Sequence, residues 1–182
     1  AAEEALRRQQ EEISFPVPFD WLKADIEIRT LETGTTYEIG ELSVAMVEQD
    51  HSHASYGFRF TDADGRSAVY STDAEYKIEK MDEEYAMAEF IAGADLFVAD
   101  TMFSLADSVS MKEDWGHSSN IVAVDLCRMG GAKRLALFHH EPTYSDADIE
   151  RMHAETIRYE ELTRGEEPIE ILCSYDGLCV EL

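Results

Sequence analysis

Short apolar runs separated by polar turns fill the first half of the chain, and this pattern predicts antiparallel strands. No Gly or Pro interrupts the charged opening, so we expect residues 1–14 to form a helical lead-in, with its helix over Ala1–Glu12. The turn Asp62–Gly65 is expected to close a hairpin, with Gly65 at a positive φ. The strands expected in this half are Asp25–Leu31 (half-exposed), Tyr37–Ile39, Leu42–Val47, Ser55–Phe60 and Ser67–Ser71.

After Asp73 the spacing changes, and helical segments alternate with short buried strands. Serines at the starts of two of these segments, Ser118-Ser119 and Ser145, are expected to cap helices. The alternation predicts an α/β fold in which a mixed sheet carries helices on its outer face, in a single domain over residues 1–182. The expected elements are the helices Asp82–Ala92, Ser118–Met129 and Asp146–Leu162, the strands Leu96–Ala99, Arg134–Phe138, Ile169–Cys173 and Leu178–Leu182, and a loop over Asp100–Gly116.

Acidic residues outnumber basic ones by 39 to 15, which gives a formal net charge of −24 at pH 7. Such a surface repels nucleic acid and anionic membranes, and a metal ion held in an acidic shell is the local exception to consider. Cys127, Cys173 and Cys179 form no CxxC motif, so we expect thiols in a reducing compartment and a cytoplasmic protein. No apolar run approaches the roughly 18 residues of a membrane span, and a homodimer is a possible assembly.

Three strand ends carry side chains of the kinds that bind metals. His51 follows one apolar run in the segment Asp50–His53, Asp73 follows a second and His139 follows a third. Parallel strand ends could bring these side chains together at one edge of the sheet, where imidazole and carboxylate ligands suit zinc, iron or manganese. The competing interpretation is that each is an ordinary polar residue.

The remaining histidines leave alternatives open. His117 precedes the helix expected from Ser118, where backbone N–H groups favour an anion such as a phosphate, and a histidine beside a phosphate suits a general acid. His53 lies two residues after His51, so the two share a face of a continuing strand and only one need bind metal. His140 either lines a site or supports a neighbouring ligand, and His153 is expected to face solvent from the last helix.

Five segments, in this order, resemble the second half of metallo-β-lactamase-fold hydrolases: DHSHASYGFRF, AVYSTDAEY, DLFVADTMF, WGHSS and LALFHHEPTYSD. The resemblance is closest to the phosphodiesterase branch, which includes tRNA 3′-processing endonucleases and cyclic-phosphate phosphodiesterases. It implies that the chain is the C-terminal half of a four-layer αβ/βα sandwich. It also implies two divalent metal ions, for which zinc is the first choice and manganese or iron the alternatives.

The resemblance implies metal ligands in particular. His51, rather than His53, matches a ligand that precedes the segment Ser55–Arg59. Asp73 matches the carboxylate that bridges the two metals, and His139 matches the last metal-binding histidine of the family.

It implies further roles around the metals. His117 matches a histidine near the scissile phosphate, which makes His117 and Asp73 the expected catalytic residues. Arg59 is expected to be structural or to contact a phosphate. His53 and His140 are expected to contact substrate or to support the ligands.

The family's His-x-His-x-Asp-His segment, which supplies most of the ligands, is not found in these 182 residues. The missing N-terminal half of the domain is therefore an expected partner. We predict a metal-dependent hydrolase that cleaves phosphodiester bonds in a small cyclic nucleotide or cyclic phosphate with a metal-activated water. The alternative is a non-catalytic binding or regulatory module that keeps the fold without the full metal site.

Overall fold

The computed structural model of the chain describes residues 2–11, 13–77, 85–108, 112 and 114–182. Contacts between residues divide the chain into two compact units, Ala1–Glu32 and Thr33–Leu182. The single domain expected over residues 1–182 stays a prediction. None of the helices in the described ranges is long and apolar enough to cross a membrane.

The first unit contains α1 (Ala2–Gln9) and a short 3-10 helix, η1 (Phe19–Trp21). Arg7 of α1 pairs with Glu3 one turn earlier and with Asp20 of η1, so the two helices are joined by an exposed guanidinium. The helix expected over Ala1–Glu12 is confirmed from Ala2 to Gln9, while residues 1 and 12 lie outside the described ranges. The strand expected over Asp25–Leu31 is wrong, because these residues pair with no other strand and alternation alone does not form a ladder.

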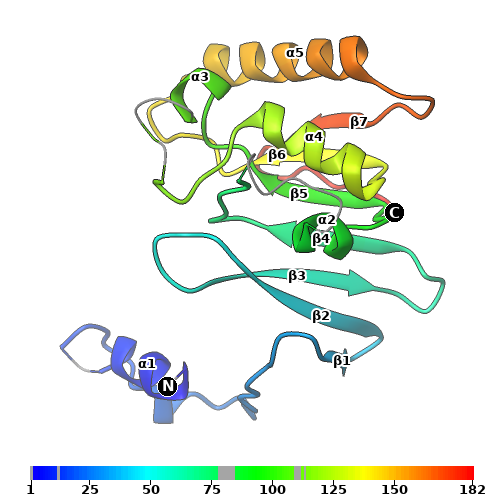
Figure 1. The fold of residues 1–182 in the computed structure, drawn as a ribbon. Coiled ribbons are helices and arrows are strands. Elements are labelled where there is room, and N and C mark those ends of the chain that lie inside the picture. The colour runs from blue at the N-terminus through cyan, green and yellow to red at the C-terminus, as the bar shows by residue number, and fades with distance from the viewer. Residues whose placement is uncertain (1, 12, 78–84, 109–111, 113) are drawn as a thin grey trace. The chain divides into compact units, whose positions relative to one another are not determined.

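The second unit is built on one seven-stranded sheet whose strands follow each other in chain order (Figure 1). The first three strand pairs are antiparallel and the last three are parallel, which confirms the mixed α/β sheet. Gly65 has a φ of 83°, as the hairpin required. The strands are β1 (Thr36–Ile39), β2 (Leu42–Gln49), β3 (Ser55–Thr61), β4 (Ser67–Ser71), β5 (Leu96–Asp100), β6 (Arg134–Phe138) and β7 (Glu170–Cys173).

In the described part of this unit, four helices accompany the sheet: α2 (Ala86–Phe90), α3 (Leu105–Ser108), α4 (Asn120–Gly130) and α5 (Asp146–Thr163). In Figure 1, α2 and α4 lie in front of the sheet. Ser119 and Ser145 cap α4 and α5, as expected. α2 lies inside the helix expected over Asp82–Ala92, whose residues 82–84 lie outside the described ranges. The loop expected over Asp100–Gly116 contains α3.

The core lies between the sheet and these helices. Val69, Phe97, Leu135 and Leu137 of the parallel strands are fully buried, and they pack in one cluster with side chains of α4 such as Leu126. Burying one such side chain stabilises the fold by about 1.5–3 kcal/mol. This burial is the main force that holds α4 on the sheet.

Two local predictions in the last third of the chain are wrong. Residues 178–182 form no strand, because they pair with no strand of the sheet. Side chains contact this tail instead: Arg134 donates to the Glu181 carbonyl (2.7 Å) and Arg66 to the Leu182 carbonyl (3.2 Å). His153 does not simply face solvent, since it is half-buried and its Nε2 bonds the Ile171 carbonyl at 3.2 Å.

The topology places four strand ends at one edge of the sheet. β2 runs antiparallel to β3, and β3 antiparallel to β4, so β2 points the same way as β4, β5 and β6. The segments after Gln49, Ser71, Asp100 and Phe138 therefore meet at this edge, where ligands bind in open α/β sheets.

Candidate metal centre

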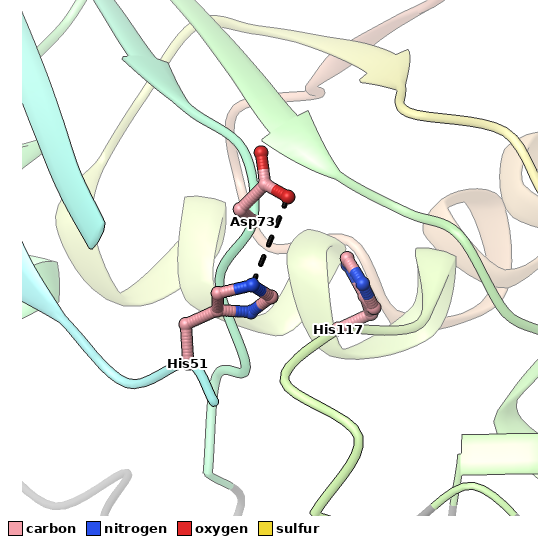
Figure 2. A group of neighbouring side chains, drawn as sticks. All are labelled: His51, Asp73 and His117. Carbon is pink, nitrogen blue, oxygen red and sulfur yellow. Dashed lines mark ion pairs between the residues drawn. The ribbon is translucent and has the colours of Figure 1, made fainter. Parts of the chain in front are cut away.

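His51 reaches this edge two residues after β2, and its ring has a defined orientation. Nδ1 lies 2.7 Å from the Gly116 carbonyl oxygen. A carbonyl can only accept, so Nδ1 carries a proton, and in the neutral ring Nε2 then has a free lone pair. That Nε2 lies 3.8 Å from Oδ1 of Asp73, along the dashed line of Figure 2. This is the arrangement of a metal-binding histidine whose other nitrogen is anchored by the backbone.

Asp73 follows β4 with a positive φ of 55°. The backbone before it is fastened by Gln49 at the end of β2, whose amide donates to the Thr72 carbonyl and whose oxygen accepts from Ser71 Oγ at 2.8 Å. Gly57 leaves room for this clamp, since a Cβ there would lie 2.8 Å from Gln49 Oε1. The backbone that carries Asp73 is therefore held where β2 and β4 end.

His139 is the first residue after β6 and also has a positive φ, 61°. Its Nε2 lies 3.7 Å from Oδ1 of Asp73, the same oxygen that faces His51. An L-residue in this backbone region is strained by about 1–3 kcal/mol. Such strain is common at functional sites, and here it occurs at Asp73 and His139 together.

His117 belongs to the same group and is held by a carboxylate that the sequence did not point out. Its Nδ1 lies 2.8 Å from Oδ2 of Asp100, the last residue of β5. Asp100 is fully buried and also accepts from the backbone N–H groups of Ala74, Met102 and Ser118, at 3.2, 3.1 and 3.3 Å. These donors stabilise an ionised carboxylate, and its hydrogen bond raises the pKa of His117 above the ordinary 6.5. An acidic residue directly ending a buried apolar run was the signal that could have found Asp100.

The rings of three histidines lie close together. His117 stacks on His139 with a centroid distance of 5.0 Å, and His51 meets His117 edge-on at 5.1 Å. Figure 2 shows the side chains of His51, Asp73 and His117 converging from three separate segments. The structure thus brings together the four residues singled out as metal-binding or catalytic.

The three remaining candidates lie apart from this group. His53 is exposed, and its Nδ1 lies 3.2 Å from its neighbour Ser52. Arg59 donates to the carbonyls of Phe90 and Ala92, both at 2.9 Å, and so holds the end of α2. These contacts support the structural role of Arg59.

His140 turns away from its neighbour His139. Its Nε2 bonds the Ser174 carbonyl at 3.3 Å, and its Nδ1 is buried without a hydrogen-bond partner in the described part of the chain. Burial lowers the pKa of this imidazole. His140 therefore links the turn after β6 to the segment after β7.

The donor set fits a divalent metal. Two combinations offer ligand atoms that all lie within 4.8 Å of one another: His51, Asp73 and His117, and Asp100, His117 and His139. Imidazole nitrogens around a carboxylate are ligands of zinc, manganese and iron. In the neutral ring of His51, the proton on the anchored Nδ1 leaves the Nε2 lone pair to a metal.

Sequence comparison identifies the family. The profile of the beta-lactamase superfamily domain matches residues 2–140. The chain belongs to this family. Among curated proteins, none matches the chain.

Solved structures share the fold of this family member. The metallo-beta-lactamase fold protein YhfI from Bacillus subtilis is 18% identical, with a TM-score of 0.62 over 82% of this chain and 54% of that one. A diphosphatase of the PhnP family is 19% identical, with a TM-score of 0.59 over 99% and 65%. The short form of human tRNase Z is 18% identical, with a TM-score of 0.54 over 80% and 45%. The chain thus spans 45–65% of the length of these proteins and has the metallo-β-lactamase fold.

Proposed function

We propose that this family member is part of a metal-dependent hydrolase of phosphodiester bonds, with a small cyclic nucleotide or cyclic phosphate as substrate. One observation carries the proposal: a single oxygen of Asp73 lies 3.8 Å from His51 Nε2 and 3.7 Å from His139 Nε2, beside the His117–Asp100 pair. A carboxylate shared by two imidazoles suits two divalent ions, zinc first, with manganese or iron as alternatives.

In this proposal His51, Asp73 and His139 would hold the two ions. The ions would lower the pKa of water to near neutrality and neutralise charge on the phosphate oxygens. The anchored ring of His51 and the strained backbone of His139 keep their Nε2 atoms aimed at Asp73 before any ion binds.

His117 supplies the proton in this proposal. The buried carboxylate of Asp100 accepts from Nδ1 and favours the imidazolium. The second ring proton, on Nε2, is then available to the leaving oxygen of the substrate, which is the task of a general acid. Asp100 also fixes the ring orientation, as the orienting carboxylate does in catalytic triads.

A further half of the domain would complete the site. His51, Asp73 and His139 are too few for two ions, since a zinc ion takes about four ligands. Two rings of the sheet offer an apolar contact for such a half: Tyr70 is 41% exposed and meets Phe138 edge-on at 5.9 Å. We propose that the missing N-terminal half packs there and contributes the remaining ligands.

The choice of substrate rests on charge and on the similar structures. A net charge of −24 disfavours a long RNA, whose phosphates bind basic surfaces. The names of two similar proteins, a diphosphatase and a tRNase, support chemistry at phosphorus. A small cyclic phosphodiester meets both conditions.

The first test is metal content by elemental analysis, on this chain and on a version extended by an N-terminal half. We expect about two ions per extended chain, fewer on this chain alone, and loss of metal in the extended His139→Ala protein without unfolding. His153→Ala is the matched control, because His153 contacts Ile171 away from the group and should leave metal content unchanged.

Activity on a 2′,3′-cyclic nucleotide should follow the metal content. Unchanged metal in His139→Ala would refute the ligand assignment. Metal binding without hydrolysis of any cyclic phosphodiester would favour the alternative, a binding module that keeps the fold.

A further inference from the structure

Glu75, two residues after Asp73, joins this segment to one about forty residues further along the chain. Its Oε1 accepts from the backbone N–H of Asp114 at 3.0 Å, and its Oε2 accepts from that of Gly116 at 3.1 Å. The side chain is only 13% exposed. One carboxylate therefore holds two N–H groups of the same turn, residues 114–116.

This turn is the anchor of His51. Gly116 donates through its N–H to Glu75 and accepts through its carbonyl from Nδ1 of His51, at 2.7 Å. The packing is close, since a Cβ at Gly116 would lie 2.3 Å from His51 Nδ1. A small shift of the turn would therefore move the acceptor away from the ring.

The turn needs to be held, because its backbone is strained. Asp114 has a φ of 61°, which is unfavourable for a residue with a side chain. Lys77 adds a second tie: its Nζ lies 2.9 Å from Glu75 Oε1 and also contacts the Asp114 carboxylate. The backbone of Glu75 is fixed in turn, since its N–H donates to the Asp50 carbonyl at 2.8 Å. Glu75 is thus linked to the residue before His51 and to the turn that receives His51.

We propose that Glu75 is a positioning residue for His51. It places the Gly116 carbonyl so that His51 keeps its proton on Nδ1 and presents an unprotonated Nε2 to Asp73. The orientation of His51 rests on contacts within this chain. Its consequence for a metal rests on the proposed function, so the two are tested by different measurements.

The test uses Glu75→Gln in the metal-free chain. A carboxamide has one acceptor oxygen, so its amino group must face one of the two backbone N–H groups, and one bond to the turn is lost. Imidazole ¹⁵N NMR reads the result directly. We expect wild-type His51 to show the Nδ1–H tautomer and Glu75→Gln to show a mixture with Nε2–H. The same tautomer in both proteins would overturn the proposal.

The metal measurement is a competition between the extended protein and a chromophoric chelator for Zn²⁺. Loss of a residue that orients a ligand typically weakens affinity about 10- to 100-fold, and we expect this for Glu75→Gln. Glu150→Gln, an exposed position on α5, is the matched control and should leave both readouts unchanged. If wild type binds no zinc, the proposed function fails, while the tautomer measurement still decides the role of Glu75.

A measurement on wild type keeps the proposal testable should Glu75→Gln not fold. The amide protons of Asp114 and Gly116 should exchange slowly with D₂O, although Asp114 is exposed, because Glu75 accepts from both. Exchange of either amide at the rate of an unprotected peptide would overturn the proposal.

Discussion

At the scale of one residue, the buried carboxylate of Asp100 shows how hydrogen bonds compensate for burial of a charge. Burying a carboxylate is costly unless hydrogen bonds replace its water. Three backbone N–H groups and the His117 ring do so here, and they come from the segments after β4, β5 and the turn before α4. The carboxylate therefore joins three segments of the site and stabilises a positive charge on His117.

We predict that NMR titration of the metal-free chain finds His117 with a pKa above 6.5 and His140 with a pKa below it, because Asp100 stabilises the first imidazolium and burial disfavours the second. In Asp100→Asn the pKa of His117 should fall. Since the folded pKa of His117 is raised, the stability it contributes is fully present below pH 6.5 and is lost as pH rises through the raised value.

The control for this titration is Asp176→Asn, an exposed turn residue that should leave His117 unchanged. A wild-type His117 that titrates at or below 6.5 would contradict the prediction.

At the scale of elements, the start of α5 is determined by residues close together in the sequence, Ser145 and Asp148. Ser145 accepts from the Asp148 N–H at 3.4 Å, and the Asp148 carboxylate accepts from the Ser145 N–H at 3.0 Å. This capping box begins at Ser145, six residues after His139, and so ends the turn that carries the ligand. The Asp148 carboxylate also accepts from the Ser145 hydroxyl at 2.6 Å, and this bond, followed by that from the Ser145 N–H, lowers the pKa of Asp148 to about 2.

We predict that Ser145→Ala lowers the free energy of unfolding by about 1 kcal/mol, the usual cost of removing a serine cap. Because the folded pKa of Asp148 is depressed, its contribution is present above pH 3.8 and is lost as pH falls towards 2. Urea unfolding at pH 7 and at pH 2 measures both effects. Ser14→Ala, an exposed serine of the first unit, is the control, and an equal change in the two variants would contradict the prediction.

At the scale of the whole molecule, the charge of −24 acts against compactness. Like charges repel over about 10 Å at 0.1 M salt, so repulsion reaches well beyond individual ion pairs. Many of the described ion pairs are exposed, such as Arg66–Asp64 and Arg158–Glu161, and contribute little. Repulsion therefore exceeds the attraction from these pairs.

We predict that the melting temperature rises between roughly 20 mM and 500 mM NaCl, because salt screens this repulsion. Calorimetry in NaCl and in choline chloride at equal ionic strength tests the cause. The same rise in both salts indicates screening, and a melting temperature that falls or stays constant would contradict the prediction.

Much of the fold could be predicted because strands, helix caps and turns depend on residues that are close together in the sequence. The strands of the second unit from Tyr37 to Cys173, the Ser119 and Ser145 caps and the positive φ of Gly65 are examples. Alternation was insufficient where a strand needs a partner, and the predictions for Asp25–Leu31 and Leu178–Leu182 are wrong for this reason.

The sequence by itself determined that His51, Asp73 and His139 follow apolar strands and that His117 precedes a helix, so these four could be selected before any geometry. Only the tertiary structure decided what holds them. The partners of Glu75 lie 39 and 41 residues away along the chain. Local patterns act over a few residues, whereas such contacts depend on how the sheet brings distant loops to one edge. The shared oxygen of Asp73 and the anchored ring of His51 are therefore properties of the folded chain.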